Sequence, residues 1–407
     1  YISLFHRFKL QYLETLTSYN KNCSFILPAR CGKEPKKQNT VGESRMKKTF
    51  APRFEKGDGV WCRARSYKLG TAYSAGDWNV GPGGGRFAPA MRKELTLKER
   101  LYALRDAGCT HVEFHSTEAP PNDVRKIKAA LRQSGLKVAM VTANLFKLPR
   151  YVGGNLGHPN EDVRNAAIKD TFQYIEFGIE HLDPDVYVYW NGSSGYNVPL
   201  GKDPLATYRH IANSIAIIVR AMVHKYGPEK ALPFCIEPKF NEPPSWGLPA
   251  DVGEALTIIG MLPDEVAPFV GINPETCHSM IGLKPYPQEL ALAQFANKLF
   301  HIHLNDGSGA KFDEDRPFGF NWPTAVWTVN TLIQGNYTGI VGFDVQPFPA
   351  DRNDQQAESV RVSIEAFGRA ICACEYIDRA ELRSAQQTDD DQRVLDIFGH
   401  AVRMGRD

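Results

Sequence analysis

The side chains with the clearest chemical potential in this 407-residue chain are carboxylates and imidazoles that follow short apolar runs. Oxygen ligands joined by one or two imidazoles suit Mg²⁺, Mn²⁺ or Co²⁺, whereas zinc favours more nitrogen and sulfur. If these side chains met at one place, they would repel one another unless cations lay between them. The sequence therefore predicts two divalent metal ions, with Glu275 able to bridge them. The candidate ligands are Glu237, Glu275, His278, His303, Asp313, Asp315 and Asp344.

A lysine accompanies this set of ligands. Lys239 lies two residues after Glu237, so on a strand both side chains would leave the same side. A simple ion pair is one interpretation. Beside a metal cluster, a fixed cation is better suited to polarising a substrate oxygen together with the ions.

The elements that must position these residues form a regular alternation. Short β-branched or aromatic runs alternate with amphipathic stretches such as residues 95–106, 161–182, 204–225 and 322–332, which is typical of parallel βαβ units. The pattern predicts an α/β fold of the (β/α)8 TIM-barrel type, with an N-terminal extension and a C-terminal helical tail. The eight expected strands are residues 71–74, 111–115, 137–144, 185–190, 233–238, 270–275, 299–305 and 340–346.

A barrel of this kind carries its active site at the carboxyl ends of the strands. Nearly every expected strand closes on a polar or aromatic side chain, which places the candidate ligands at one mouth. The structural rival is an open, doubly wound sheet, which usually has a Gly-rich phosphate turn that opens a helix after its first strand. The glycines of residues 81–85 open no clear helix, so a dinucleotide site is not expected.

Three domains of sequence are expected. Residues 1–66 form an N-terminal extension without a clear period, which favours disorder; residues 67–350 form the barrel; residues 351–407 form the last barrel helix and a tail suited to contacting another subunit.

Composition narrows the partners and the setting. A formal net charge of +2 argues against nucleic acid, and no apolar run reaches the roughly 18 residues needed to span a membrane. The eight cysteines are scattered, which indicates a reducing, cytoplasmic setting. Cys372 and Cys374 lack a second pair at zinc spacing and are expected to be buried thiols.

Several phrases occur in one order that resembles xylose isomerase. They are VTANLF at 141–146, IEPKFNEP at 236–243, GINPE at 271–275 with His278, KLFHI at 298–302, KFDED at 311–315 and GFD at 342–344. The resemblance runs from about Trp78 to Asp344. It implies a metal-dependent aldose–ketose isomerase that interconverts D-xylose and D-xylulose, or a similar sugar, by ring opening and a metal-assisted 1,2-hydride shift.

The resemblance also implies a role for each candidate residue. Glu237, Glu275, His303 and Asp344 would form one metal site, and Glu275, His278, Asp313 and Asp315 the other. His115 would assist ring opening with Glu118 as its orienting carboxylate, and Lys239 would contact the oxygen at the carbonyl end of the sugar. The remaining substrate contacts would be Trp78, Thr142, Phe146, Trp190 and Asn273. Family members form homodimers or homotetramers.

The chain also departs from the family pattern. His303 stands where the family has an aspartate, as in L-rhamnose isomerase, and shifts the preference toward Mn²⁺ or Co²⁺. Gln346 replaces an expected lysine, and residues 191–195 replace a charged loop. An L-rhamnose isomerase, a ketose 3-epimerase and a sugar-binding protein therefore stay open as alternatives, whereas the net charge disfavours a DNA-repair nuclease on a related barrel.

Overall fold

The computed structural model describes residues 65–82, 92–309, 312–348 and 355–405. The expected extension therefore lies, up to residue 64, outside the described residues, as do Cys23, Cys31 and Cys62.

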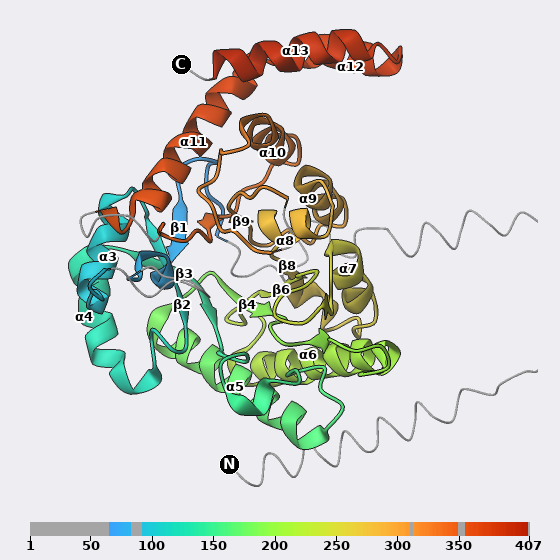
Figure 1. The fold of residues 1–407 in the computed structure, drawn as a ribbon. Helices are drawn as coiled ribbons and strands as arrows, with labels where there is room; N and C mark the ends of the chain where they lie inside the picture. The colour runs from blue at the N-terminus through green and yellow to red at the C-terminus, as the bar shows by residue number, and fades with distance from the viewer. Residues whose placement is uncertain (1–64, 83–91, 310–311, 349–354, 406–407) are drawn as a thin grey trace, which may run out of the picture. The chain divides into compact units, whose positions relative to one another are not determined.

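Eight parallel strands form the centre of the molecule (Figure 1). They are hydrogen-bonded in the order β8-β6-β4-β3-β2-β1-β10-β9. Parallel bridges from Ile272 to Leu299 and from Glu275 to His303 join the segment that begins with β8 to the one that contains β9, which closes the ring. The expected TIM barrel is thus confirmed. The strands are β1 (Tyr73–Gly76), β2 (His111–His115), β3 (Lys137–Thr142), β4 (Val186–Trp190), β6 (Phe234–Glu237), β8 (Val270–Ile272), β9 (His303–Leu304) and β10 (Val341–Phe343).

Helices surround the strands and continue beyond them at the C-terminus (Figure 1). The π-helical residues Gly178–Leu182 extend α5, so the expected helix over 161–182 is realised in two parts. Trp322 at the start of α10 donates its indole N–H to the Val402 carbonyl at 2.8 Å, which ties the tail to the barrel. The helices are α3 (Leu97–Asp106), α4 (Val124–Ser134), α5 (Glu161–Phe177), α6 (Pro204–Tyr226), α7 (Val252–Gly260), α8 (Thr276–Ile281), α9 (Tyr286–Phe295), α10 (Trp322–Gln334), α11 (Glu358–Glu375), α12 (Arg379–Gln387) and α13 (Asp391–Met404).

Side chains that cap the helices explain where several of them begin. Thr96 and Glu99 form a reciprocal capping box at the start of α3. Asp203, Asp251 and Asp378 accept backbone N–H groups at the starts of α6, α7 and α12. Each cap satisfies N–H groups that have no partner within the helix.

Alternation along the strands separates two apolar layers. Tyr187 and Tyr189 of β4 belong to the large core that includes the helices, whereas Val186 and Val188 belong to a small, separate cluster with Met140. Successive strand residues point to opposite faces, so the small cluster fills the barrel interior. Polar side chains lie above this apolar layer, at the carboxyl ends of the strands.

A few sequence expectations need correction. β1 begins and ends two residues later than expected, at Tyr73–Gly76. Cys374 is a buried thiol as expected, but Cys372 is exposed. The five cysteines of the described ranges are free, and no helix in these ranges is long and apolar enough to cross a membrane.

Candidate active site

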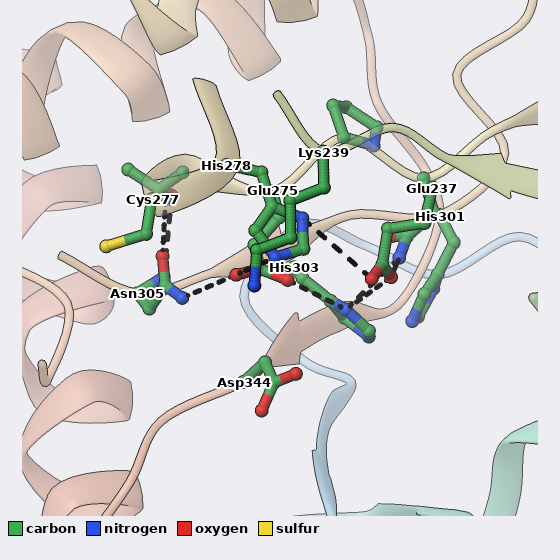
Figure 2. Close-up of polar contacts among 12 residues, drawn as sticks. Glu237, Lys239, Glu275, Cys277, His278, His301, His303, Asn305 and Asp344 are labelled. Carbon is green, nitrogen blue, oxygen red and sulfur yellow. Dashed lines mark hydrogen bonds and ion pairs between the residues drawn. The ribbon is translucent and has the colours of Figure 1, made fainter. Parts of the chain in front are cut away.

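Glu275 lies at the centre of the polar mouth (Figure 2). It follows β8 and directly precedes α8, and only 1% of it is exposed. Its Oε1 lies 3.2 Å from His278 Nε2 and accepts a hydrogen bond of 2.8 Å from Asn305 Nδ2. Three groups of possible metal ligands share this one carboxylate, each with ligand atoms within 4.8 Å of one another. They are Glu237 with His278, His303 with Asp344, and Asp313 with Asp315.

Buried carboxylates of this centre lie close enough to repel one another. Burial, together with the nearby charges of Asp313 and Asp344, raises the pKa of Glu275 to about 7. Burial and the same acidic neighbours also raise the pKa of Asp315 well above its usual range. Close carboxylates that cannot all be charged in a dry site are relieved by a bound cation.

Several buried atoms of the centre make no hydrogen bond to the described part of the chain. They are Glu275 Oε2, Asp313 Oδ1 and His278 Nδ1. Buried polar atoms are normally paired, so these atoms have free capacity for a ligand. The donor set of carboxylates and imidazoles fits a divalent cation such as Mn²⁺, Co²⁺ or Mg²⁺. Since such ligands must be deprotonated, metal affinity should rise with pH.

Lys239 lies beside the centre, as its spacing from Glu237 predicted. Its Nζ is 2.8 Å from Asp313 Oδ2, and His278 Nε2 is 3.1 Å from the same oxygen. Burial opposes the charge on both partners, but their mutual attraction raises the pKa of Lys239 and lowers that of Asp313. The amine also lies 5.5 Å from the Trp190 ring centroid, so one buried cation faces both the acidic cluster and an aromatic wall.

Asp344 approaches the centre from the end of β10 (Figure 2). One of its oxygens, Oδ1, accepts hydrogen bonds from Trp78 Nε1 at 2.8 Å and Asn79 Nδ2 at 2.9 Å. Both donors follow β1, so the first and last strands of the barrel are joined at this carboxylate. Trp78 thus holds a candidate metal ligand in addition to the wall position expected of it.

A row of rings lines one side of the mouth. The Trp78 and His115 rings are stacked with centroids 3.9 Å apart, and Phe146 lies edge-on to both His115 and Trp190. Glu118 Oε2 is 3.4 Å from His115 Nδ1. Burial opposes the charge on Glu118, but His115 lowers the pKa of this carboxyl to about 2. The expected histidine, carboxylate and aromatic wall are therefore adjacent.

Asn273 and Thr142 are both buried at strand ends. Asn273 Nδ2 donates to Glu237 Oε2 and lies 3.1 Å from His303 Nδ1, while its own Oδ1 makes no hydrogen bond to the described residues. Asn273 thus orients two candidate ligands. Thr142 ends β3 and presents no contact with the acidic centre among those seen in the described ranges.

Sequence reasoning missed two residues beneath this mouth. Glu113 of β2 contacts both His301 and His303, and these three residues form a further group of possible ligands. Burial opposes charge on Glu113 and His303, but the two imidazoles hold the pKa of Glu113 well below its usual range. Glu113 and Glu237 likewise raise the pKa of His303 well above its usual range. Glu113 precedes His115 by two residues, and His301 precedes His303 by two. Residues at this spacing on a strand share a face, so the spacing could have identified both missed residues as inward-facing.

The closed barrel and its acidic, imidazole-rich mouth define the protein as a TIM barrel with a candidate metal centre at the carboxyl ends of its strands. Residues 101–366 match the model of the family described as "Xylose isomerase-like TIM barrel", and the chain belongs to this family.

Solved structures with the same fold include three sugar-related proteins. A structure of L-ribulose 3-epimerase aligns with a TM-score of 0.55 at 13% identity, and the alignment covers 75% of this chain and 97% of the epimerase chain. A xylose isomerase domain protein from Alicyclobacillus acidocaldarius has a TM-score of 0.53 at 15% identity, covering 75% and 99%. D-psicose 3-epimerase from Clostridium cellulolyticum, solved with D-tagatose, has a TM-score of 0.51 at 14% identity, covering 75% and 98%. At these identities the likeness shows the fold.

Proposed function

We propose that this protein is a metal-dependent aldose–ketose isomerase that interconverts D-xylose and D-xylulose or a similar sugar. The observation that carries the proposal is the meeting of three features at one mouth. These are the acidic cluster around Glu275, the buried Lys239 beside it, and His115 against the aromatic rings. An epimerase or a binding protein has no evident need for this lysine.

Seven side chains would hold two divalent ions, with Glu275 shared between the sites. When bound, the ions would polarise the sugar oxygens so that hydrogen can pass between C1 and C2 as hydride. One site would comprise Glu237, Glu275, His303 and Asp344, and the other Glu275, His278, Asp313 and Asp315. Glu237 lies 3.0 Å from His303 Nδ1 and also forms a group of possible ligands with Glu275 and His278.

The remaining residues bind, orient and exclude water. His115 would transfer the proton that opens the sugar ring. Glu118, whose Oε2 lies 3.4 Å from His115 Nδ1, would orient the imidazole. Lys239 would donate to the oxygen at the carbonyl end of the open chain and stabilise its developing charge. Trp78, Phe146 and Trp190 would shield the transferred hydrogen from water.

Thr142 and Asn273 complete the proposed contacts to the sugar. The carbonyl oxygen of the Asn273 amide is buried and available to accept from a sugar hydroxyl, since its NH₂ group already faces Glu237. Thr142 lies one strand away, at the end of β3.

The identity of the sugar is the finer part of the proposal. His303 favours L-rhamnose as the alternative aldose, because a histidine at this ligand position resembles L-rhamnose isomerase. The likeness in fold to two ketose 3-epimerases supports C3 epimerisation as the second candidate reaction. That reaction needs two carboxylates on opposite faces of the sugar.

The test is product analysis with defined metals. Chelated protein is given Mg²⁺, Mn²⁺ or Co²⁺ singly and incubated with D-xylose, D-glucose, L-rhamnose or L-arabinose, and also with D-psicose. Metal-restored formation of a ketose from one aldose supports the isomerase. Conversion of D-psicose to its C3 epimer, with no ketose formed from any aldose, identifies the epimerase and contradicts the proposal.

The setting and assembly are also proposals. The five cysteines of the described ranges are free, which is compatible with the reducing, cytoplasmic location that we propose. We propose a homodimer or homotetramer in which the tail with α12 and α13 contacts a second copy. We expect a small sugar as the partner, without nucleic acid or membrane.

A further inference from the structure

Glu113 occupies an unusual position in the middle of the barrel. It lies on β2 with no exposed surface, two residues before His115. Its Oε2 is 2.8 Å from His303 Nε2, and its Oε1 is 3.0 Å from His301 Nε2 and accepts the Ser74 hydroxyl. Both oxygens are therefore paired, and the carboxylate reaches across the barrel from β2 to the segment of β9.

The contact fixes which edge of His303 faces the acidic centre. While Nε2 meets Glu113, Nδ1 lies 3.0 Å from Glu237 Oε2 and 3.7 Å from Glu275 Oε2 (Figure 2). A ring flip would replace both nitrogens by C–H groups, one facing Glu113 and the other facing Glu237. The imidazole is thus clamped between one carboxylate below it and the candidate metal ligands above it.

We infer that Glu113 is a positioning residue for the metal centre, which accepts the Nε2–H of His303 and so directs the Nδ1 lone pair at the ion. The inference rests on the proposed function only in taking His303 as a ligand. Histidine ligands commonly donate their second N–H to a carboxylate, which fixes the tautomer and makes the ligand more basic.

The charge of Glu113 gives it a second consequence for the ion. A neutral imidazole leaves the ligand set with one negative charge fewer than a carboxylate would at the same place. Glu113 returns that charge one hydrogen bond away, in a fully buried position where its field is little screened. A centre that contains His303 should therefore depend on Glu113 for its affinity.

The alternative is that Glu113 serves stability alone, by pairing two buried imidazoles and Ser74. Asp185 provides a matched control for this alternative. It is a buried carboxylate at the opposite end of the barrel, paired with Tyr67 Oη at 2.7 Å and Arg65 Nη1 at 2.8 Å, and within the described ranges it makes no hydrogen bond or ion pair with His303 or the acidic ligands. Loss of its charge should lower stability without altering the metal centre.

The experiment compares Glu113→Gln with Asp185→Asn in metal-free full-length protein. Co²⁺ is titrated calorimetrically, and its visible absorption is recorded as a readout of ligand geometry. We expect Glu113→Gln to weaken Co²⁺ binding roughly 10- to 100-fold and to alter the absorption bands, in line with other outer ligand partners. Asp185→Asn should keep the wild-type affinity and spectrum.

Wild-type Co²⁺ affinity and spectrum in Glu113→Gln would overturn the inference, as would equal losses in the two variants. If Glu113→Gln does not fold, the protonation of His303 is measured instead in the wild type, by ¹⁵N NMR of histidine-labelled protein with bound Zn²⁺. The His303 signals are assigned by their absence from the spectrum of His303→Asn. A proton on Nε2 and metal at Nδ1 supports the inference, whereas a proton on Nδ1 overturns it. A wild-type protein that binds no metal contradicts the proposed function instead, so the two failures are distinguishable.

Discussion

The two ends of the barrel both contain buried charged groups, but the groups are paired differently. At the amino ends of the strands, Asp185 is matched by Tyr67 and Arg65, and Thr110 Oγ1 lies 2.8 Å from His111 Nδ1. At the carboxyl ends, five carboxylates share two imidazoles and one lysine, and several of their buried atoms make no hydrogen bond in the described ranges. The first arrangement is complete within the protein, and the second becomes complete only with added positive charge.

This difference separates structural polarity from functional polarity. A matched cluster stabilises the fold in the absence of any ligand, whereas an unmatched cluster destabilises the protein until a cation binds. Substitutions at the amino ends of the strands, here called the lower end, should therefore change stability alone. Substitutions at the carboxyl ends, here called the upper end, should change metal binding and turnover, and can even stabilise the metal-free chain.

The largest effect is expected from Lys239→Met, which keeps most of the length of the side chain and removes its charge. The variant should lower kcat by about 100- to 1000-fold, the usual effect of removing a group that stabilises developing charge. It should still bind Mn²⁺, because Lys239 is not a ligand. Steady-state rates of ketose formation provide the measurement.

Lys225→Met is the matched control, since Lys225 pairs with Glu176 on the outer surface of the barrel. Its rates should equal those of the wild type. Turnover that survives in Lys239→Met would show that this lysine serves only as an ion-pair partner of Asp313.

Glu275→Gln should abolish the stabilisation of the protein by metal. Wild-type protein at a Mn²⁺ concentration 100 times Kd should gain about 2.7 kcal/mol, and the variant close to none. Without metal the variant should unfold at a higher temperature than the wild type, because a neutral amide removes repulsion with Asp313 and Asp344. Thermal unfolding with Mn²⁺ and with chelator measures both effects.

Glu265→Gln, which alters an exposed partner of Arg220, serves as the control for Glu275→Gln. It should leave the metal-dependent shift in Tm unchanged. An equal metal-dependent shift in Tm for Glu275→Gln and the wild type would show that Glu275 does not bind the metal.

The lower end should show its own dependence on pH. Burial, with Lys137 and Arg65 nearby, lowers the pKa of His111 to about 4 from an ordinary value near 6.5. As the pH falls from 6.5 to 4, the unfolded chain takes up this proton before the folded chain does, so stability is lost in that window. The protonation of His111 should lower the free energy of unfolding by about 3 kcal/mol over this range.

Urea unfolding at pH 7 and at pH 4.5, in the presence of chelator, tests this expectation against His111→Gln. The variant should lose less stability than the wild type over the same interval. Identical pH dependence in the two proteins would show that His111 takes up its proton normally in the fold.

The smallest effect is expected from Tyr67→Phe, which removes the hydroxyl that donates to Asp185. The free energy of unfolding should fall by about 1 kcal/mol, the usual net contribution of one hydrogen bond. Metal affinity and turnover should not change. Any loss of Mn²⁺ affinity in this variant would mean that the two ends are coupled.

The sequence predicted the barrel and most of the upper cluster because both follow from local pattern. Eight apolar runs had the spacing of βα units, and strand ends in a barrel meet at one mouth, which brought Glu237, Glu275 and Asp344 together. The late start of β1 was missed because the apolar run there is short and ends in glycine.

Contacts across the barrel could not be predicted in the same way. Glu113 and His303 are 190 residues apart, and only strand order and register place one opposite the other. A closed barrel makes β1 and β10 neighbours, but the turn after β1 that brings the indole of Trp78 to Asp344 does not follow from the sequence pattern. That most candidate ligands lie together was thus predictable from strand ends, whereas the residues that contact and orient them required the structure.

Equilibrium dialysis against Mn²⁺, followed by metal analysis of the wild type and Glu275→Gln, measures occupancy of the proposed metal centre itself. We expect each wild-type chain to retain two ions and the variant to lose retained metal. Absence of Mn²⁺ from the wild type, or equal retention by both proteins, would contradict it.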